Sequence, residues 1–186
     1  MMRMLVNGLS WLMTLLWPFL VWFSVTHPSH RWLLVLLALM FLLRFATLRG
    51  DKRVFKGTGL LLAVAGAALC LASLLLRDGQ WLFWYPVAVN AVMLLLFGSS
   101  LYSGMPLVER LARLRESELP PQAVAYTYRV TQIWCLFFIF NGSVAVLTCL
   151  VGNVHWWTLW NGMVSYLLMG LLMGGEWLIR QRLRRR

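Results

Sequence analysis

Six long apolar stretches, separated by short polar segments, divide the chain. They cover residues 4–25, 32–48, 57–76, 81–102, 123–150 and 154–179. A helix of about 20 residues crosses the hydrocarbon core of a bilayer, where only helices and closed barrels satisfy their backbone polar groups. Barrel strands alternate apolar and polar positions, and these stretches do not. The pattern predicts an all-α polytopic membrane protein, with about six transmembrane helices in a single bundle domain over residues 1–186.

Composition supports a membrane location. Hydrophobic residues make up 61% of the 186 positions, against roughly 45–50% in a typical soluble domain. The first stretch follows Arg3 and has no small-residue cleavage site, so we expect a retained helix rather than a signal peptide. The net charge is +11, and the basic residues that produce it lie mainly between the apolar stretches and at the C-terminus. We therefore expect anionic lipid head groups as partners and no nucleic acid.

The distribution of lysine and arginine predicts the orientation. With the N-terminus inside, the inner side collects fifteen of them and the outer side only Arg31 and Arg77. Basic residues favour the cytoplasmic side, so six helices with both termini cytoplasmic are preferred. Tryptophans favour the membrane interface, and those at the predicted outer ends are Trp22, Trp32, Trp81, Trp84, Trp156, Trp157 and Trp160.

The segment from Pro106 to Pro121, "PLVERLARLRESELPP", carries unusual charge for this chain. Apolar residues recur at helical spacing at positions 107, 108, 111 and 114, and charged residues at 109, 110, 113 and 116 take the other side. The pattern predicts a short amphipathic helix over residues 106–119, lying in the inner interface with its arginines among lipid phosphates. A solvated loop is the alternative.

Polar side chains within the spans are candidates for function, because such groups are costly in lipid. The intramembrane polar candidates are Asn90, Gln132, Asn141, Asn161 and Ser165. One hypothesis is that Asn90, Asn141 and Asn161 converge on a polar centre. Separate interhelical hydrogen bonds are the alternative.

Charged side chains near the predicted cytoplasmic ends are candidates for binding lipid head groups or a partner protein. They are Arg110, Arg113, Arg115, Arg129, Glu176 and Arg180. Glu176 precedes Arg180 by four residues, so an ion pair within the helix is expected. Arg129 is placed to hold a phosphate group or Glu176. Gly170 and Gly174 form a G-x-x-x-G that permits close helix approach.

Two motifs in the second half of the chain resemble those of a bacterial family. "PLVERLARLRESELPP", followed by "RVTQIWCLFFIFNG", is similar to the intracellular septation protein A family of inner-membrane-spanning proteins. The matching positions are Pro106, Leu107, Val108, Arg110, Leu119, Pro120, Trp134, Phe137, Phe138 and Gly142. The chain departs from the family in having one more residue between the arginine and the Leu-Pro pair, and Ala145 where an asparagine is frequent.

A nearer resemblance is to a family of bacterial membrane proteins whose genes tend to sit among ketosynthase, acyl-carrier and acyltransferase genes of aryl-polyene-type pigment or lipid synthesis. The blocks that carry this resemblance are Arg129–Gly142 and Asn161–Arg180. It implies a multi-pass protein of the bacterial inner membrane that serves cell-envelope biogenesis, and no particular reaction.

Three functions stay open at this point. The first is a non-enzymatic accessory or scaffold for lipid- or polyene-type acyl synthesis, whose basic face attracts acidic acyl-carrier or synthase proteins. The second is a small transporter or flippase for a lipid-linked intermediate. The third is a membrane enzyme that acts on an acyl or lipid substrate through Glu176 or His155. A homo-oligomer is compatible with all three.

Recognisable catalytic motifs are absent from the sequence. His27 and His30 share one predicted loop and His155 comes from another, and the three cysteines have no metal or redox spacing. We therefore expect no catalytic residue, no metal and no cofactor.

Overall fold

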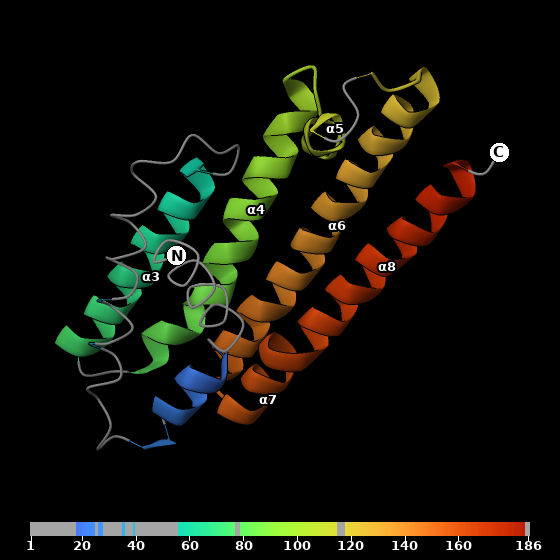
Figure 1. Ribbon diagram of the computed structural model, residues 1–186. Helices are drawn as coiled ribbons and strands as arrows, with labels where there is room; N and C mark the ends of the chain where they lie inside the picture. Colours follow the sequence, from blue (N-terminus) through green and yellow to red (C-terminus); the bar gives the residue numbers. More distant parts are fainter. Residues whose placement is uncertain are drawn as a thin grey trace, which may run out of the picture.

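The computed structural model describes residues 18–24, 26–27, 35, 39, 56–76, 79–114 and 118–184. Every labelled element in these ranges is helical (Figure 1). In chain order they are α3 (Lys56–Leu75), the 3-10 helix η2 (Gly79–Trp84), α4 (Tyr85–Tyr102), α5 (Leu107–Arg113), α6 (Pro121–Val151), α7 (Val154–Leu159), the π-helical turn η3 (Trp160–Val164) and α8 (Ser165–Arg184). Residues 18–24 are helical as well.

Three helical segments are long and apolar enough to cross a bilayer. They are Gln80–Tyr102, Pro121–Val151 and Val154–Gln181, which confirms the predicted stretches 81–102, 123–150 and 154–179 as helices of spanning length. The chain is therefore a helical membrane protein. The predicted stretch 57–76 is helical as well, as the 20-residue α3. The first two predicted spans lie mostly outside the described residues, so the count of six stays a prediction.

Successive long helices run in opposite directions. Figure 1 shows the start of α3, the end of α4, the start of α6 and the end of α8 at the same end of the molecule as α5. The end of α3 and the whole of α7 lie at the opposite end. We call these the α5 end and the α7 end.

The turn between α6 and α7 follows from two residues. Gly152 adopts a φ of 69°, and its N–H bonds carbonyl groups of the last turn of α6. Glycine adopts this left-handed conformation without steric cost. Asn153 then caps α7, because its side chain accepts hydrogen bonds from two N–H groups of the first turn. The chain therefore reverses within two residues.

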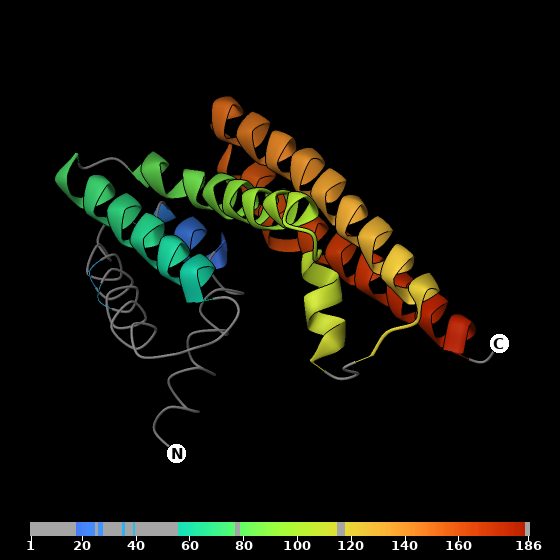
Figure 2. The same cartoon turned by 90° about the horizontal axis from the view of Figure 1, so that it is seen from above.

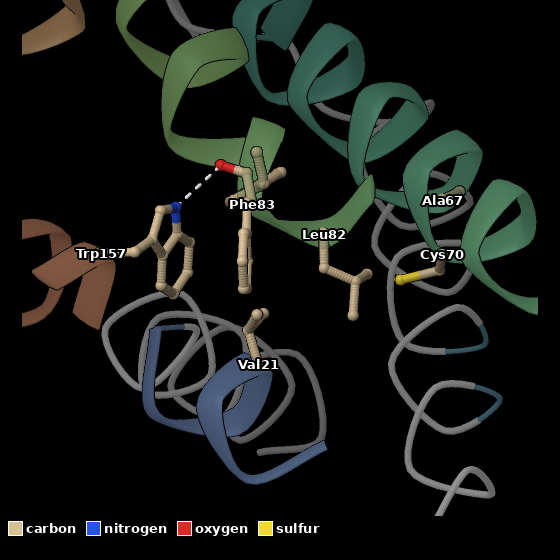
Figure 3. Close-up of a cluster of buried hydrophobic side chains, with 7 residues drawn as sticks. Val21, Ala67, Cys70, Leu82, Phe83 and Trp157 are labelled. Atoms are coloured by element: carbon tan, nitrogen blue, oxygen red, sulfur yellow. Dashed lines mark hydrogen bonds between the residues drawn. The ribbon is translucent and has the colours of Figure 1, made fainter. Parts of the chain in front are cut away.

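A buried apolar core joins the elements at the α7 end (Figure 3). Its members are Val21, Ala67, Cys70, Leu82, Phe83, Tyr85 and Trp157. The Trp157 indole stacks on the Phe83 ring with 4.8 Å between centroids, and its Nε1 donates to the Phe83 carbonyl oxygen at 3.0 Å.

The position of Trp157 corrects one prediction. We expected its indole at the membrane interface with the other tryptophans, but it is fully buried. The reason is that the Phe83 carbonyl satisfies the indole N–H inside the core. Trp81, Trp84 and Trp156 are exposed around this core.

Helix α5 is shorter than predicted and presents different faces. Figure 1 shows α5 end-on, and Figure 2 shows it lying across the direction of α4 and α6, as expected of an interfacial helix. We predicted helix over residues 106–119 with Glu109 on the polar side. The helix covers Leu107–Arg113, Glu109 is buried, and Leu111 and Leu114 are exposed. Burial of Glu109 is made tolerable by Arg113, whose Nε donates to its carboxylate at 2.8 Å.

Candidate functional site

Four polar side chains join α4, α6, η3 and α8 inside the apolar bundle. We call this cluster, made of Asn90, Asn141, Trp160 and Ser165, the Asn141 hub. Asn141 donates from Nδ2 to Asn90 Oδ1 at 3.0 Å. Its Oδ1 accepts from Trp160 Nε1 at 3.1 Å and from Ser165 Oγ at 2.7 Å. The Asn90 amide donates to the Pro86 carbonyl at 2.8 Å, so every polar group of the two asparagine side chains has a partner.

The π-helical turn η3 explains how two donors of one chain segment reach a single oxygen. Trp160 and Ser165 are five residues apart, and in a regular α-helix this spacing separates side chains by about 140°. In η3 the Ser165 N–H bonds the Trp160 carbonyl, the five-residue pattern of a π turn. The wider turn brings both side chains toward α6.

Asn161 lies outside the hub. Its Nδ2 donates to the Trp157 carbonyl at 2.9 Å and to Thr148 Oγ1 at 3.3 Å, while its Oδ1 is buried without a partner. The hypothesis of one polar centre is thus right for Asn90 and Asn141. For Asn161 the alternative, a separate interhelical bond, holds.

Helices α4 and α6 approach each other closely beside the hub. A Cβ atom added at Gly142 would lie 3.1 Å from Asn90 Cβ, so only glycine allows this crossing distance without displacement. Toward the α5 end, four aromatic rings continue the contact. They belong to Phe97, Trp134, Phe137 and Phe138. Gln132 is exposed on α6 and takes no part in the hub.

The carboxylate of Glu176 pairs with Arg180 at the α5 end of α8. Arg180 Nε donates to Glu176 Oε1 at 3.0 Å, and the Nη2 atom bonds the same oxygen. This confirms the predicted intrahelical ion pair. The Tyr126 hydroxyl of α6 donates to the Glu176 carbonyl at 3.2 Å and holds α8 against α6. Arg129 is exposed, and within the described ranges no ion pair joins it to Glu176.

Two arginines of α5 bond within the chain. Arg110 donates from Nε to the Met105 carbonyl at 2.9 Å and from Nη2 to Ser103 Oγ at 2.7 Å. Arg113 pairs with Glu109. Arg110 therefore ties α5 to the turn that follows α4, whereas the pair of Arg113 with Glu109 lies within α5 itself. Arg115 lies outside the described residues.

Two open hollows lie on the described surface, one beside α3 and α4 and the other beside α4 and α6. Asn90 borders the second, and neither is lined by Asn141 or Asn161. In the described part of the chain no group of three His, Cys, Asp or Glu side chains is placed to hold a metal.

Sequence reasoning missed the donors Trp160 and Tyr126 and the acceptor Thr148. Each of them bonds a candidate residue on a neighbouring element, so its role depends on how the helices are rotated and aligned. The only available signal was their position, within about a turn or two of helix from a predicted polar candidate.

No protein-family model, curated protein or solved structure matches this chain. The family resemblances, and the lipid- or partner-binding roles of the charged candidates, therefore stay predictions.

Proposed function

We propose that this chain is a six-span protein of the bacterial inner membrane, with both termini cytoplasmic, that acts as an accessory or scaffold for lipid- or polyene-type acyl synthesis. In this proposal the α5 end faces the cytoplasm and attracts an acidic acyl-carrier or synthase protein. The proposal is supported by one observation above all: the basic residues of the described helices lie at the α5 end, whereas three of the exposed indoles, Trp81, Trp84 and Trp156, lie at the α7 end and Trp177 alone of them lies near the end of α8.

The basic residues gather at the α5 end. Arg110 and Arg113 lie on α5, Arg129 lies near the start of α6 and Arg180 near the end of α8, so three elements contribute (Figure 1). The exposed tryptophans of the opposite end lie on η2 and α7. Two carboxylates of the α5 end are paired, Glu109 with Arg113 and Glu176 with Arg180. Arg110 and Arg129, together with Arg182 and Arg184 of α8, outnumber the remaining described carboxylate, Glu118. This excess of positive charge steers acidic partners over distances near the Debye length.

A transporter would need a polar cavity that a substrate can enter. The residues expected to line it are Asn90, Asn141 and Asn161, and both asparagines of the hub bond protein groups through their side-chain oxygen and nitrogen. This arrangement favours a scaffold over a flippase, because these bonds hold α4, α6 and α8 together.

The docking proposal is tested with the full chain in nanodiscs and a purified acidic acyl-carrier protein, with binding measured at two ionic strengths. We expect Arg129→Gln and Arg115→Gln to weaken binding and to reduce its salt dependence. At Arg110 and Arg113, which also bond within the chain, the variants are Arg110→Lys and Arg113→Lys, because lysine keeps the positive charge on which docking depends. The control is Arg77→Gln on the predicted outer side. Binding that is unchanged by neutralising Arg115 and Arg129 together would refute the docking proposal.

The orientation is tested separately with reporter fusions after Lys52 and at the last residue. We expect both reporters on the cytoplasmic side. Reporters on opposite sides would contradict the six-span arrangement while leaving the structure of the three long helices intact.

A further inference from the structure

Helix α6 is longer than the hydrocarbon core of a bilayer is thick, and the excess lies at the α5 end. Its 31 residues rise about 46 Å, whereas about 20 residues cross the core. Residues 133–151 carry no charged side chain, and the turn at Gly152 follows them directly. The edge of the hydrocarbon core at the α5 end therefore lies near Gln132, and about three turns of α6 stand outside it.

Two polar side chains lie on the exposed face of α6 at this edge. Gln132 is exposed, and so is Arg129, which lies three residues, or about 4.5 Å, further from the core. The head-group layer is roughly 5–7 Å thick on each side of the core, so Arg129 lies within it. Neither side chain bonds another residue in the described part of the chain. Deeper in the membrane, the exposed Leu136 and Phe140 continue the same helix face at four-residue spacing.

The order of these side chains along α6 matches the order of chemical groups in a glycerophospholipid. Such a lipid has its phosphate in the head-group layer, its ester carbonyls at the edge of the hydrocarbon core and its acyl chains below. A guanidinium binds phosphate through charge-assisted hydrogen bonds, and an amide N–H donates to a carbonyl oxygen. From the head-group layer inward, α6 presents an arginine, then an amide, then apolar side chains.

The charge balance of the chain disfavours a second copy, or another segment of the same chain, as the occupant of this face. Arg129 needs an anion, and the chain has 17 basic but only 6 acidic residues. Two of these six, Glu109 and Glu176, are already paired with arginines of their own helices. A second copy carries the same excess of positive charge, so two such faces repel each other. An acidic soluble protein can approach Arg129 from the aqueous side, but Gln132 lies at the hydrocarbon edge and beyond its reach.

We propose that the exposed face of α6 around Arg129 and Gln132 binds one anionic diacyl phospholipid of the phosphatidylglycerol type. Arg129 binds the lipid phosphate, and the Gln132 amide donates to an ester carbonyl. An anionic head group is favoured over a zwitterionic one, because an ammonium group would enter the positive field of the α5 end. The inference does not rest on carrier docking, which depends on arginine charges and not on the amide of Gln132.

The experiment measures binding of the first lipid to the full chain in detergent by native mass spectrometry. The probes are diester phosphatidylglycerol and its diether analogue, which keeps the phosphate and both chains but lacks the carbonyl oxygens. We expect the unmodified chain to bind the diester about threefold more tightly, which corresponds to one average hydrogen bond in a membrane protein. Gln132→Leu should bind both lipids equally. Arg129→Gln should weaken binding of both by about tenfold, because it removes a charge-assisted bond.

Gln122→Leu is the matched control. Gln122 is exposed on the first turn of α6, about 15 Å further from the core than Gln132, so loss of its amide should leave the diester preference unchanged. The proposal is overturned if the unmodified chain shows no diester preference, or if Gln122→Leu abolishes it as Gln132→Leu does. Dimers that Gln132→Leu removes from the spectrum would also overturn it, because a second copy would then cover this face. Carrier binding tests the docking proposal separately, since Gln132→Leu keeps every arginine charge.

Discussion

Replacing Asn141 by alanine tests whether the hub holds α8 in place. The change removes three side-chain hydrogen bonds, to Asn90, Trp160 and Ser165. Interhelical hydrogen bonds in membrane proteins contribute about 0.6 kcal/mol on average, with a maximum near 1.7. Three such bonds predict a loss of about 2 kcal/mol in the free energy of unfolding. The loss grows if Asn90 Oδ1, which is buried, finds no new donor.

The loss is measured by reversible unfolding in bicelles, either by steric trapping or by titration with a denaturing detergent. The matched control is Ser143→Ala, two residues further along α6. Ser143 is exposed, and its hydroxyl bonds only the Ile139 carbonyl of its own helix at 2.8 Å. A double-mutant cycle between Asn141 and Ser165 should give a coupling of about 0.6 kcal/mol. If Asn141→Ala costs no more than Ser143→Ala, the hub contributes nothing and our account of α8 fails.

Substitutions at two further positions test the packing on either side of the hub. Gly142→Ala should destabilise the protein by about 1 kcal/mol, because the new methyl group meets Asn90 Cβ at 3.1 Å. Gly170→Ala is the control for helix propensity, since no atom lies within 4 Å of its added Cβ. Equal stabilities of the two variants would contradict the close crossing of α4 and α6. Trp157→Phe should lower the free energy of unfolding by about 1 kcal/mol, through loss of the bond to the Phe83 carbonyl. Trp157→Ala should lower it by about 3–5 kcal/mol, through the cavity left in the core. Thermal unfolding in detergent measures both, and an unchanged midpoint for Trp157→Ala would show that this core is not needed for stability.

The sequence was enough to locate three helices of spanning length, because length and apolarity are properties of a contiguous segment. It also identified the ion pair of Glu176 with Arg180, since both partners lie on one helix at a known spacing. It could not assign the partners of Asn141 and Asn161, because these depend on the depth and rotation of neighbouring helices. Trp157 was misplaced for the same reason, because an indole near a helix end can face either lipid or the core.

The π turn makes a more demanding prediction, because it can be removed. A π turn arises when one extra residue is accommodated in a regular helix, so deleting the exposed Met163 should convert η3 to α-helix. Trp160 and the following serine would then be four residues apart and still share a face.

Deletion of the exposed Leu171, in the regular part of α8, would instead rotate the rest of the helix by about 100° and turn Glu176 away from Tyr126. We therefore expect the Met163 deletion to retain most of the unfolding free energy and the Leu171 deletion to lose more. Bicelle unfolding of the two variants compares them directly. The opposite order would mean that the wide turn is itself required, and that bringing two donors to Asn141 is not the reason it exists.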